Sequence, residues 1–125
     1  MPNLSIDVYG PGHDVTGRAS ATVAASQFVK ISGNADEGVI AVAPADAGGR
    51  VAGVAKYAAA QGELVGLARG ASRVVRVTAD GAVAAFSEIE VGANGKAKTK
   101  TSGVAVGYAV TAAAAGSLAL VSLYH

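Results

Sequence analysis

The chain has 125 residues, ten basic and nine acidic side chains, and a composition that is 51% hydrophobic but only 5% aromatic. This near-balance of charge gives no concentrated basic surface for nucleic acid, and the absence of cysteine excludes disulfides and thiolate metal sites. No apolar run reaches the roughly 20 residues of a membrane span. The apolar residues are mostly Ala and Val, so we expect a thin core that gains stability from association with other chains.

The first segment, residues 1–12, is predicted to be an extended arm. Residues 4–9 (Leu-Ser-Ile-Asp-Val-Tyr) alternate apolar and polar side chains with the period of a strand, and the Gly-Pro-Gly at 10–12 ends the pattern. The segment lacks the basic start and apolar run of a signal peptide. Such an arm can add a strand to the sheet edge of another protein. The candidate binding residues are therefore Leu4, Ile6, Val8 and Tyr9.

Two blocks of sequence then recur. Residues 23–34 match 83–94, and residues 53–67 match 107–121, in each case without a gap. The connection between the blocks is longer in the first copy than in the second. The matches include glycines and an asparagine, which the abundance of Ala and Val does not explain. We predict one duplicated domain over 13–125, with repeat one at about 22–70 and repeat two at about 82–123.

Each copy has the pattern of β structure. Phe28–Ile31 and Glu88–Val91 alternate, which places Glu88 and Glu90 on the solvent side of their strand. We predict strands at 51–57 and 64–68, and again at 104–110 and 118–123. The loops between them, 58–62 and 111–116, contain Gly62 and Gly116, which supply a positive φ. Residues 73–78, between the copies, also have strand-like composition.

These short strands predict an all-β fold, a small β-barrel or sandwich built from two tandem repeats, with an extended N-terminal arm. The Ala-rich loops at 58–61 and 112–115 are too short for a stable helix and hold at most one helical turn.

No combination of residues predicts catalysis. His13 beside Asp14 has no Ser or Cys partner in a known signature, and His125 is the last residue. Residues 34–37 offer too few oxygen ligands for calcium, and the Gly-rich turns do not match a nucleotide-binding loop. The two Phe and four Tyr are scattered along the chain. We therefore expect no enzyme activity, no catalytic residue, no metal site and no cofactor.

Several motifs occur in a recognisable order. They are residues 29–33 (Val-Lys-Ile-Ser-Gly), 53–55 (Gly-Val-Ala), the Ala-rich loop at 58–60, 62–65 (Gly-Glu-Leu-Val), 76–79 (Arg-Val-Thr-Ala) and 94–96 (Asn-Gly-Lys). In this order, over roughly residues 12–123, the chain resembles the capsid decoration (head cement) proteins of tailed bacteriophages.

The resemblance implies a structural protein that binds the outside of an expanded phage head and stabilises neighbouring major capsid subunits. It implies the major capsid protein as partner and a homo-trimer at three-fold or quasi-three-fold positions. The balanced charge and the lack of a long apolar run predict neither nucleic acid nor a membrane as partner. The expected location is the capsid exterior of the virion, after synthesis in the host cytoplasm. The alternative is a ligand- or carbohydrate-binding β-barrel adhesion module, which the absence of Trp disfavours.

Overall fold

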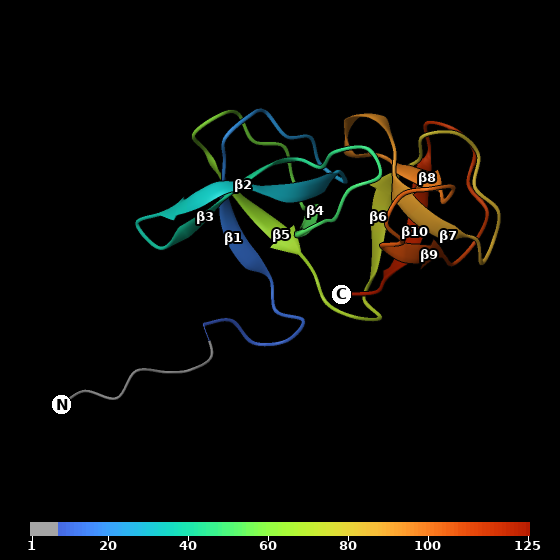
Figure 1. Cartoon of the computed structure of the whole chain (residues 1–125), viewed down its shortest axis with the longest axis horizontal. Helices are drawn as coiled ribbons and strands as arrows, with labels where there is room; N and C mark the ends of the chain where they lie inside the picture. Colours follow the sequence, from blue (N-terminus) through green and yellow to red (C-terminus); the bar gives the residue numbers. More distant parts are fainter. Residues whose placement is uncertain (1–7) are drawn as a thin grey trace.

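The computed structural model describes residues 8–125, which form two β units side by side (Figure 1). The strands are β1 (Val15–Ala19), β2 (Phe28–Asp36), β3 (Val39–Pro44), β4 (Gly53–Ala55), β5 (Leu64–Ala68), β6 (Val74–Thr78), β7 (Glu88–Val91), β8 (Ala97–Thr99), β9 (Gly107–Ala109) and β10 (Leu118–Leu123), with a short 3-10 turn, η1 (Ala93–Gly95), before β8. The first five strands form one unit, called here the first barrel, and the last five form the second sheet. The all-β prediction is confirmed.

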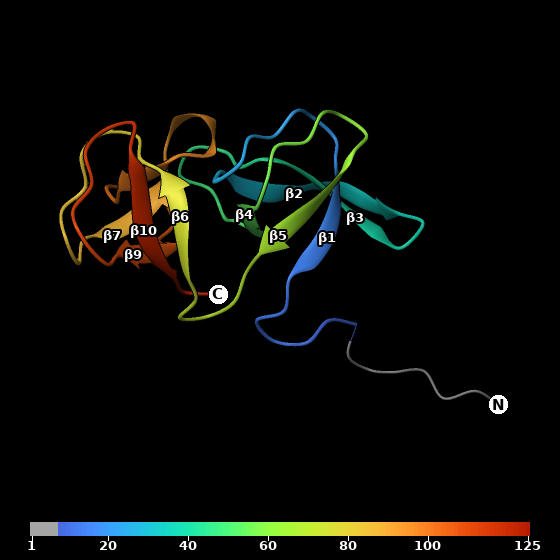
Figure 2. The same cartoon turned by 180° about the vertical axis from the view of Figure 1, so that it is seen from behind.

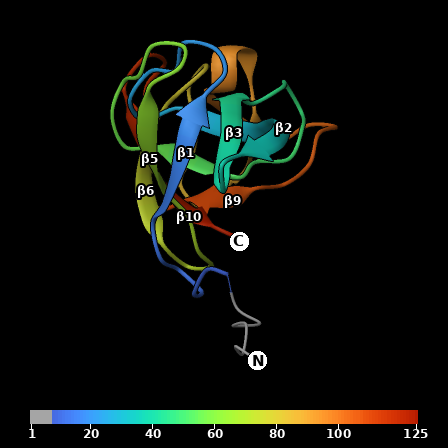
Figure 3. The ribbon, with the colours of Figure 1, turned by 90° about the vertical axis from the view of Figure 1, so that its left-hand side faces the viewer.

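The first barrel is closed, with the strand order β1-β3-β2-β4-β5. Strand β1 closes it by pairing parallel with β3, from Gly17↔Ile40 to Ala19↔Val42, and antiparallel with β5. Closure leaves the first barrel without a free edge for uncontrolled pairing. Its core contains Ala19, Val23, Val29, Val42, Ala55, Ala59, Val65 and Leu67. Seen along the long axis, β1 and β3 lie on the side away from the second sheet (Figure 3).

The second sheet repeats the pairings of the first barrel. Strands β6 to β10 pair antiparallel in the order β6-β10-β9-β7-β8, which matches the antiparallel pairs β1-β5, β5-β4, β4-β2 and β2-β3 of the first barrel. The isolated bridges Val23↔Ala59 and Val83↔Ala113 also occupy equivalent places. Residues 73–78, between the two predicted repeats, thus begin the second sheet as β6, and β1 is the counterpart of β6. The limits of the two repeats stay a prediction.

The two units differ in how they close. In the second sheet, β6 and β8 meet only through one parallel bridge, Ala79↔Ala97, in place of the three parallel pairs that join β1 to β3. The second sheet is therefore incompletely closed between these strands. Figure 2 shows β6 on the side of the second sheet that faces the first barrel.

Side chains of the first barrel enter this opening. Phe28, Ala45 and Val54 are buried in the same cluster as the core of the second sheet, and Phe28 has no exposed surface. The residues beside Phe28 bond to both borders of the opening. Thr78 N, at the end of β6, donates to Ser26 O (3.0 Å). Gln27 Nε2 donates to Asn94 O in the β7–β8 turn (2.7 Å), so the first barrel completes the core of the second sheet.

Some strands differ from the predicted ones. Strands β4 and β9 have only three residues each, because the residues before and after them leave the sheet. Strands β3 and β8 lie in segments that were predicted only as connections. The Ala-rich loops contain no helical turn, because Ala59 and Ala113 instead pair in isolated bridges. The predicted strand at 4–9 lies mostly outside the described residues.

Candidate interaction surfaces

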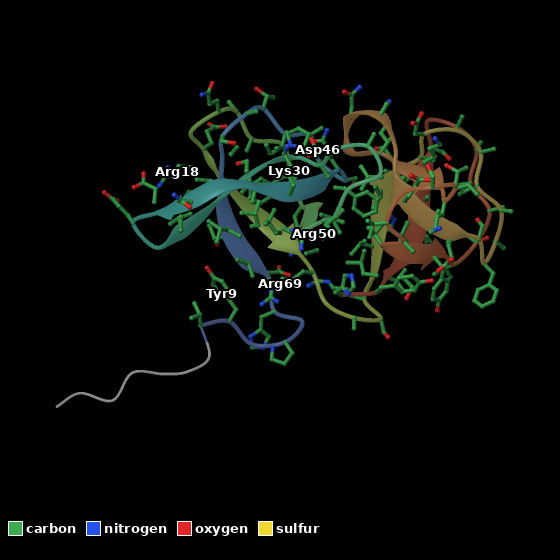
Figure 4. The ribbon with its side chains drawn as sticks, viewed as in Figure 1. Tyr9, Arg18, Lys30, Asp46, Arg50 and Arg69 are labelled. Atoms are coloured by element: carbon green, nitrogen blue, oxygen red, sulfur yellow. The ribbon has the colours of Figure 1, made fainter. Side chains whose placement is uncertain are left out.

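The base of the arm, residues 8–14, lies against the linker between β5 and β6. Arg69 Nη2 donates to Gly10 O (2.8 Å), and its guanidinium lies 5.6 Å from the centre of the Tyr9 ring (Figure 4). Arg73 Nη1 donates to Gly12 O at 3.3 Å. These contacts fix the point where the arm leaves the body, on the same lower side of the molecule as the linker and the C-terminus (Figure 1).

A pair of ion pairs strengthens this base. The Asp14 carboxylate accepts hydrogen bonds from Lys56 Nζ and Arg73 Nη1, both at 2.6 Å. The two cations, Lys56 first and then Arg73, hold the pKa of Asp14 below its usual range because they favour the charged carboxylate. Asp14 therefore links the chain before β1 to the segment after β4 and to the start of β6.

Of the four predicted binding residues of the arm, the structure places two. Val8 is 80% exposed, and Tyr9 is half exposed beside Arg69. Leu4 and Ile6 lie outside the described residues. Capsid binding by the arm therefore stays a prediction, although its starting point is now defined.

An aromatic face on the second sheet was missed by the sequence reasoning, which treated the aromatic residues as scattered. The ring of Phe86 meets the edge of Tyr108 at a centroid distance of 5.3 Å, and Tyr108 lies 6.3 Å from Tyr124. Tyr124 Oη donates to Glu88 Oε2 at 2.8 Å, and this bond raises the pKa of the phenol because the carboxylate stabilises its protonated form. Phe86 is 79% exposed, so the face is open to solvent.

Further apolar residues extend the aromatic face. Leu120 and Ser122 alternate along β10, and Ser122 pairs with Tyr108, so Leu120 points to the same side as that ring. Val110 follows Tyr108 by two residues and is 46% exposed. The aromatic face therefore combines apolar side chains with the Glu88 carboxylate, and Arg76 of β6, which pairs with Leu120, lies at its border.

Glu90, predicted on the solvent side, is instead buried, with 4% of its surface exposed. Its carboxylate accepts hydrogen bonds from the backbone N and from Oγ1 of Thr101, and these bonds lower the pKa of Glu90. Gly48 of the first barrel lies beside the same loop, where its O accepts a bond from Val104 N (3.0 Å). Glu90 faces away from the core of its sheet, as the alternation predicts, but the β8–β9 loop covers its side chain.

A shallow groove of about 370 Å³ lies on the first barrel and is lined by Lys30, Ile31, Asp46, Arg50, Val51 and Ala52. Lys30 and Asp46 form an ion pair of 2.8 Å within it (Figure 4), and Ile31 is 53% exposed. Within residues 8–125, Arg50 has no ion pair. The groove thus combines apolar side chains with an unpaired cation.

Over the described part of the chain, no three His, Cys, Asp or Glu side chains gather in a way that could hold a metal ion. The same residues include no helix long and apolar enough to cross a membrane. What the geometry offers is contact surface: the base of the arm, the aromatic face and the groove.

Neither a protein-family model nor a curated protein matches the sequence. Among solved structures, the fold is similar to the N base of head fiber gp8.5 in bacteriophage phi29, with a TM-score of 0.77 and 22% sequence identity. The match covers 89% of this chain and 92% of that chain, so the likeness includes both β units. At this identity the likeness concerns the fold.

Proposed function

We propose that this chain is a structural protein of a tailed-phage head, which binds the outer surface of the capsid and holds neighbouring major capsid subunits together. The observation that carries the proposal is the fold likeness to the base of a phage head fiber, extending over nearly the whole of both chains. The order of motifs at 53–55, 62–65, 76–79 and 94–96 supports the same assignment through its resemblance to decoration proteins.

The contact surfaces fit such a role. A cement protein needs a rigid body and several weak contacts that act together, because linked contacts raise the effective concentration of each. Arg69, Arg73 and Asp14 hold the base of the arm in place. The arm, through Leu4, Ile6, Val8 and Tyr9, then adds a strand to a capsid loop, and three copies occupy each three-fold or quasi-three-fold position.

A second candidate function is the base of a fibre that projects from the head. It is favoured by the name of the structural neighbour, which describes a fiber base rather than a cement protein. The two candidates differ in what binding does to the capsid. A cement protein stabilises the shell, whereas a fibre base needs only to remain attached to it.

The experiment is to add the purified chain to empty expanded heads and to unexpanded heads of the same phage. Cement function predicts binding to the expanded form together with a higher temperature of head disruption, measured by scanning calorimetry. Binding with no change in that temperature would favour the fibre base. Binding to a glycan array without binding to heads would reverse the assignment in favour of the adhesion module.

A further inference from the structure

We propose that the aromatic face of the second sheet is an interface between copies of this chain, and that it binds the groove at Ile31 and Arg50 on the first barrel of the next copy. The inference rests on the proposed function, because it names the contact that would hold the copies together on the head.

The equivalent face of the first barrel is already covered. Phe28 and Val54 point outward from the first barrel and are buried against the second sheet, while Val29 and Ala55, next to them, point into the barrel core. The residues at the same positions of β7 and β9 are Glu88 and Tyr108. Among residues 8–125, no third β unit covers these two side chains.

The composition of the aromatic face indicates binding to another protein. Phe86 adopts a positive φ of 65°, which is unusual for a bulky residue, and its side chain is almost fully in solvent. The equivalent turn of the first barrel has the same backbone conformation with a small residue, Ser26, at φ 58°. The turn therefore does not require an aromatic side chain. Exposed Phe and Tyr side chains are enriched where proteins bind one another.

The groove on the first barrel matches this face in chemistry. It offers the exposed apolar side chain of Ile31 to the aromatic rings, and the Arg50 guanidinium to the Glu88 carboxylate. Two aromatic faces meeting about a two-fold axis would instead place one Glu88 near the other, and like charges in contact oppose binding. The opening between β6 and β8 is already covered by the first barrel of the same copy, so it is not free to bind another copy.

The contact is therefore head-to-tail, from the second sheet of one copy to the first barrel of the next. A contact of this kind closes into a ring when its rotation allows, and otherwise continues as a filament. A ring of three copies is the form that fits the proposed three-fold positions.

Cysteine cross-linking tests the contact directly, because the chain has no cysteine of its own. One sample of the chain carries Phe86→Cys and a second carries Ile31→Cys, both at exposed positions. After mixing and mild oxidation, we expect mixed disulfide dimers at least about tenfold faster than with a Tyr57→Cys control, because the interface raises the effective concentration of the two thiols. Faster dimers of the Phe86→Cys chain with itself, or a mixed rate equal to the control, would overturn the inference.

Charge reversal gives an independent readout by sedimentation equilibrium. Glu88→Arg alone and Arg50→Glu alone should each weaken self-association, and the double variant should restore it, since every contact then regains opposite charges. Equal loss in the double variant would contradict the pairing. If the wild-type chain binds heads but the cross-linking and charge-reversal results both contradict the contact, only the proposed interface is wrong. If it associates as expected but does not bind heads, the proposed function is wrong.

Discussion

Replacement of Phe28 by Ala is expected to unfold the second sheet more readily than the first barrel, although Phe28 belongs to the first barrel. The side chain has no exposed surface and is buried with the core of the second sheet. Removal of a buried Phe side chain costs about 3–5 kcal/mol, since it loses apolar burial and leaves a cavity. Domains of this kind have a total stability of about 5–15 kcal/mol, so the loss is a large share of it.

The only other phenylalanine provides a matched control. Phe86 is 79% exposed, so Phe86→Ala removes the same atoms with an expected change within about 0.5 kcal/mol. Urea unfolding followed by circular dichroism should show a midpoint lowered by roughly 1–3 M for Phe28→Ala and almost unchanged for Phe86→Ala. Amide hydrogen exchange then locates the loss, which we expect in β6, β8 and β9.

Two results would refute this reasoning. One is an equal loss of stability in the two alanine variants. The other is a Phe28→Ala protein in which the amides of β1, β3 and β5 exchange faster while those of the second sheet keep their protection. Either result would mean that the second sheet has a complete core without side chains from the first barrel.

Three further predictions concern titration and the arm. Because the pKa of Glu90 is lowered in the fold, its bonds to Thr101 stabilise the fold above the ordinary carboxyl pKa, and this stability is lost as the pH falls through the folded pKa. In Glu90→Gln, the free energy of unfolding should therefore depend less on pH over this acid range. The raised pKa of Tyr124 acts in the opposite direction. Its bond to Glu88 stabilises the fold below the phenol's unfolded pKa and is lost as the pH rises through the folded value, so ultraviolet titration should show one late phenol that disappears in Tyr124→Phe. Deletion of residues 1–8 should leave the unfolding midpoint unchanged and weaken binding to heads, measured by co-sedimentation. Undiminished binding would show that the arm does not contribute to capsid attachment.

The strands that could be predicted are those in which a repeated, alternating pattern decides the structure. Strands β5 and β10 begin and end as predicted, with Gly62 and Gly116 at positive φ in the turns before them. Strand β3 was missed because Val39–Pro44 is continuously apolar and lies where the two copies differ in length. Strand β8 is only three residues long, which is too short for a periodic signal.

The contact between the two units had a signal in the sequence that was not used. At equivalent positions the first copy has Phe28 before Val29, and the second has Glu88 before Ile89. Two adjacent apolar residues at the start of a strand mean that both faces are covered, whereas the charged residue in the second copy marks an open face. The aromatic face itself could not be predicted, because Phe86, Tyr108 and Tyr124 come together only through the pairing of β7, β9 and β10.

The position of the chain ends has a consequence for using this protein as a carrier. The base of the arm, the linker and the C-terminus lie along the lower side of the molecule in Figure 1, while the turns before β2 and β5 lie along its upper side. A peptide fused after His125 would therefore compete for space with the arm at an attachment surface. A peptide inserted at Gln61–Gly62, an exposed turn where a Cβ added at Gly62 would meet no atom within 4 Å, would be displayed outward instead.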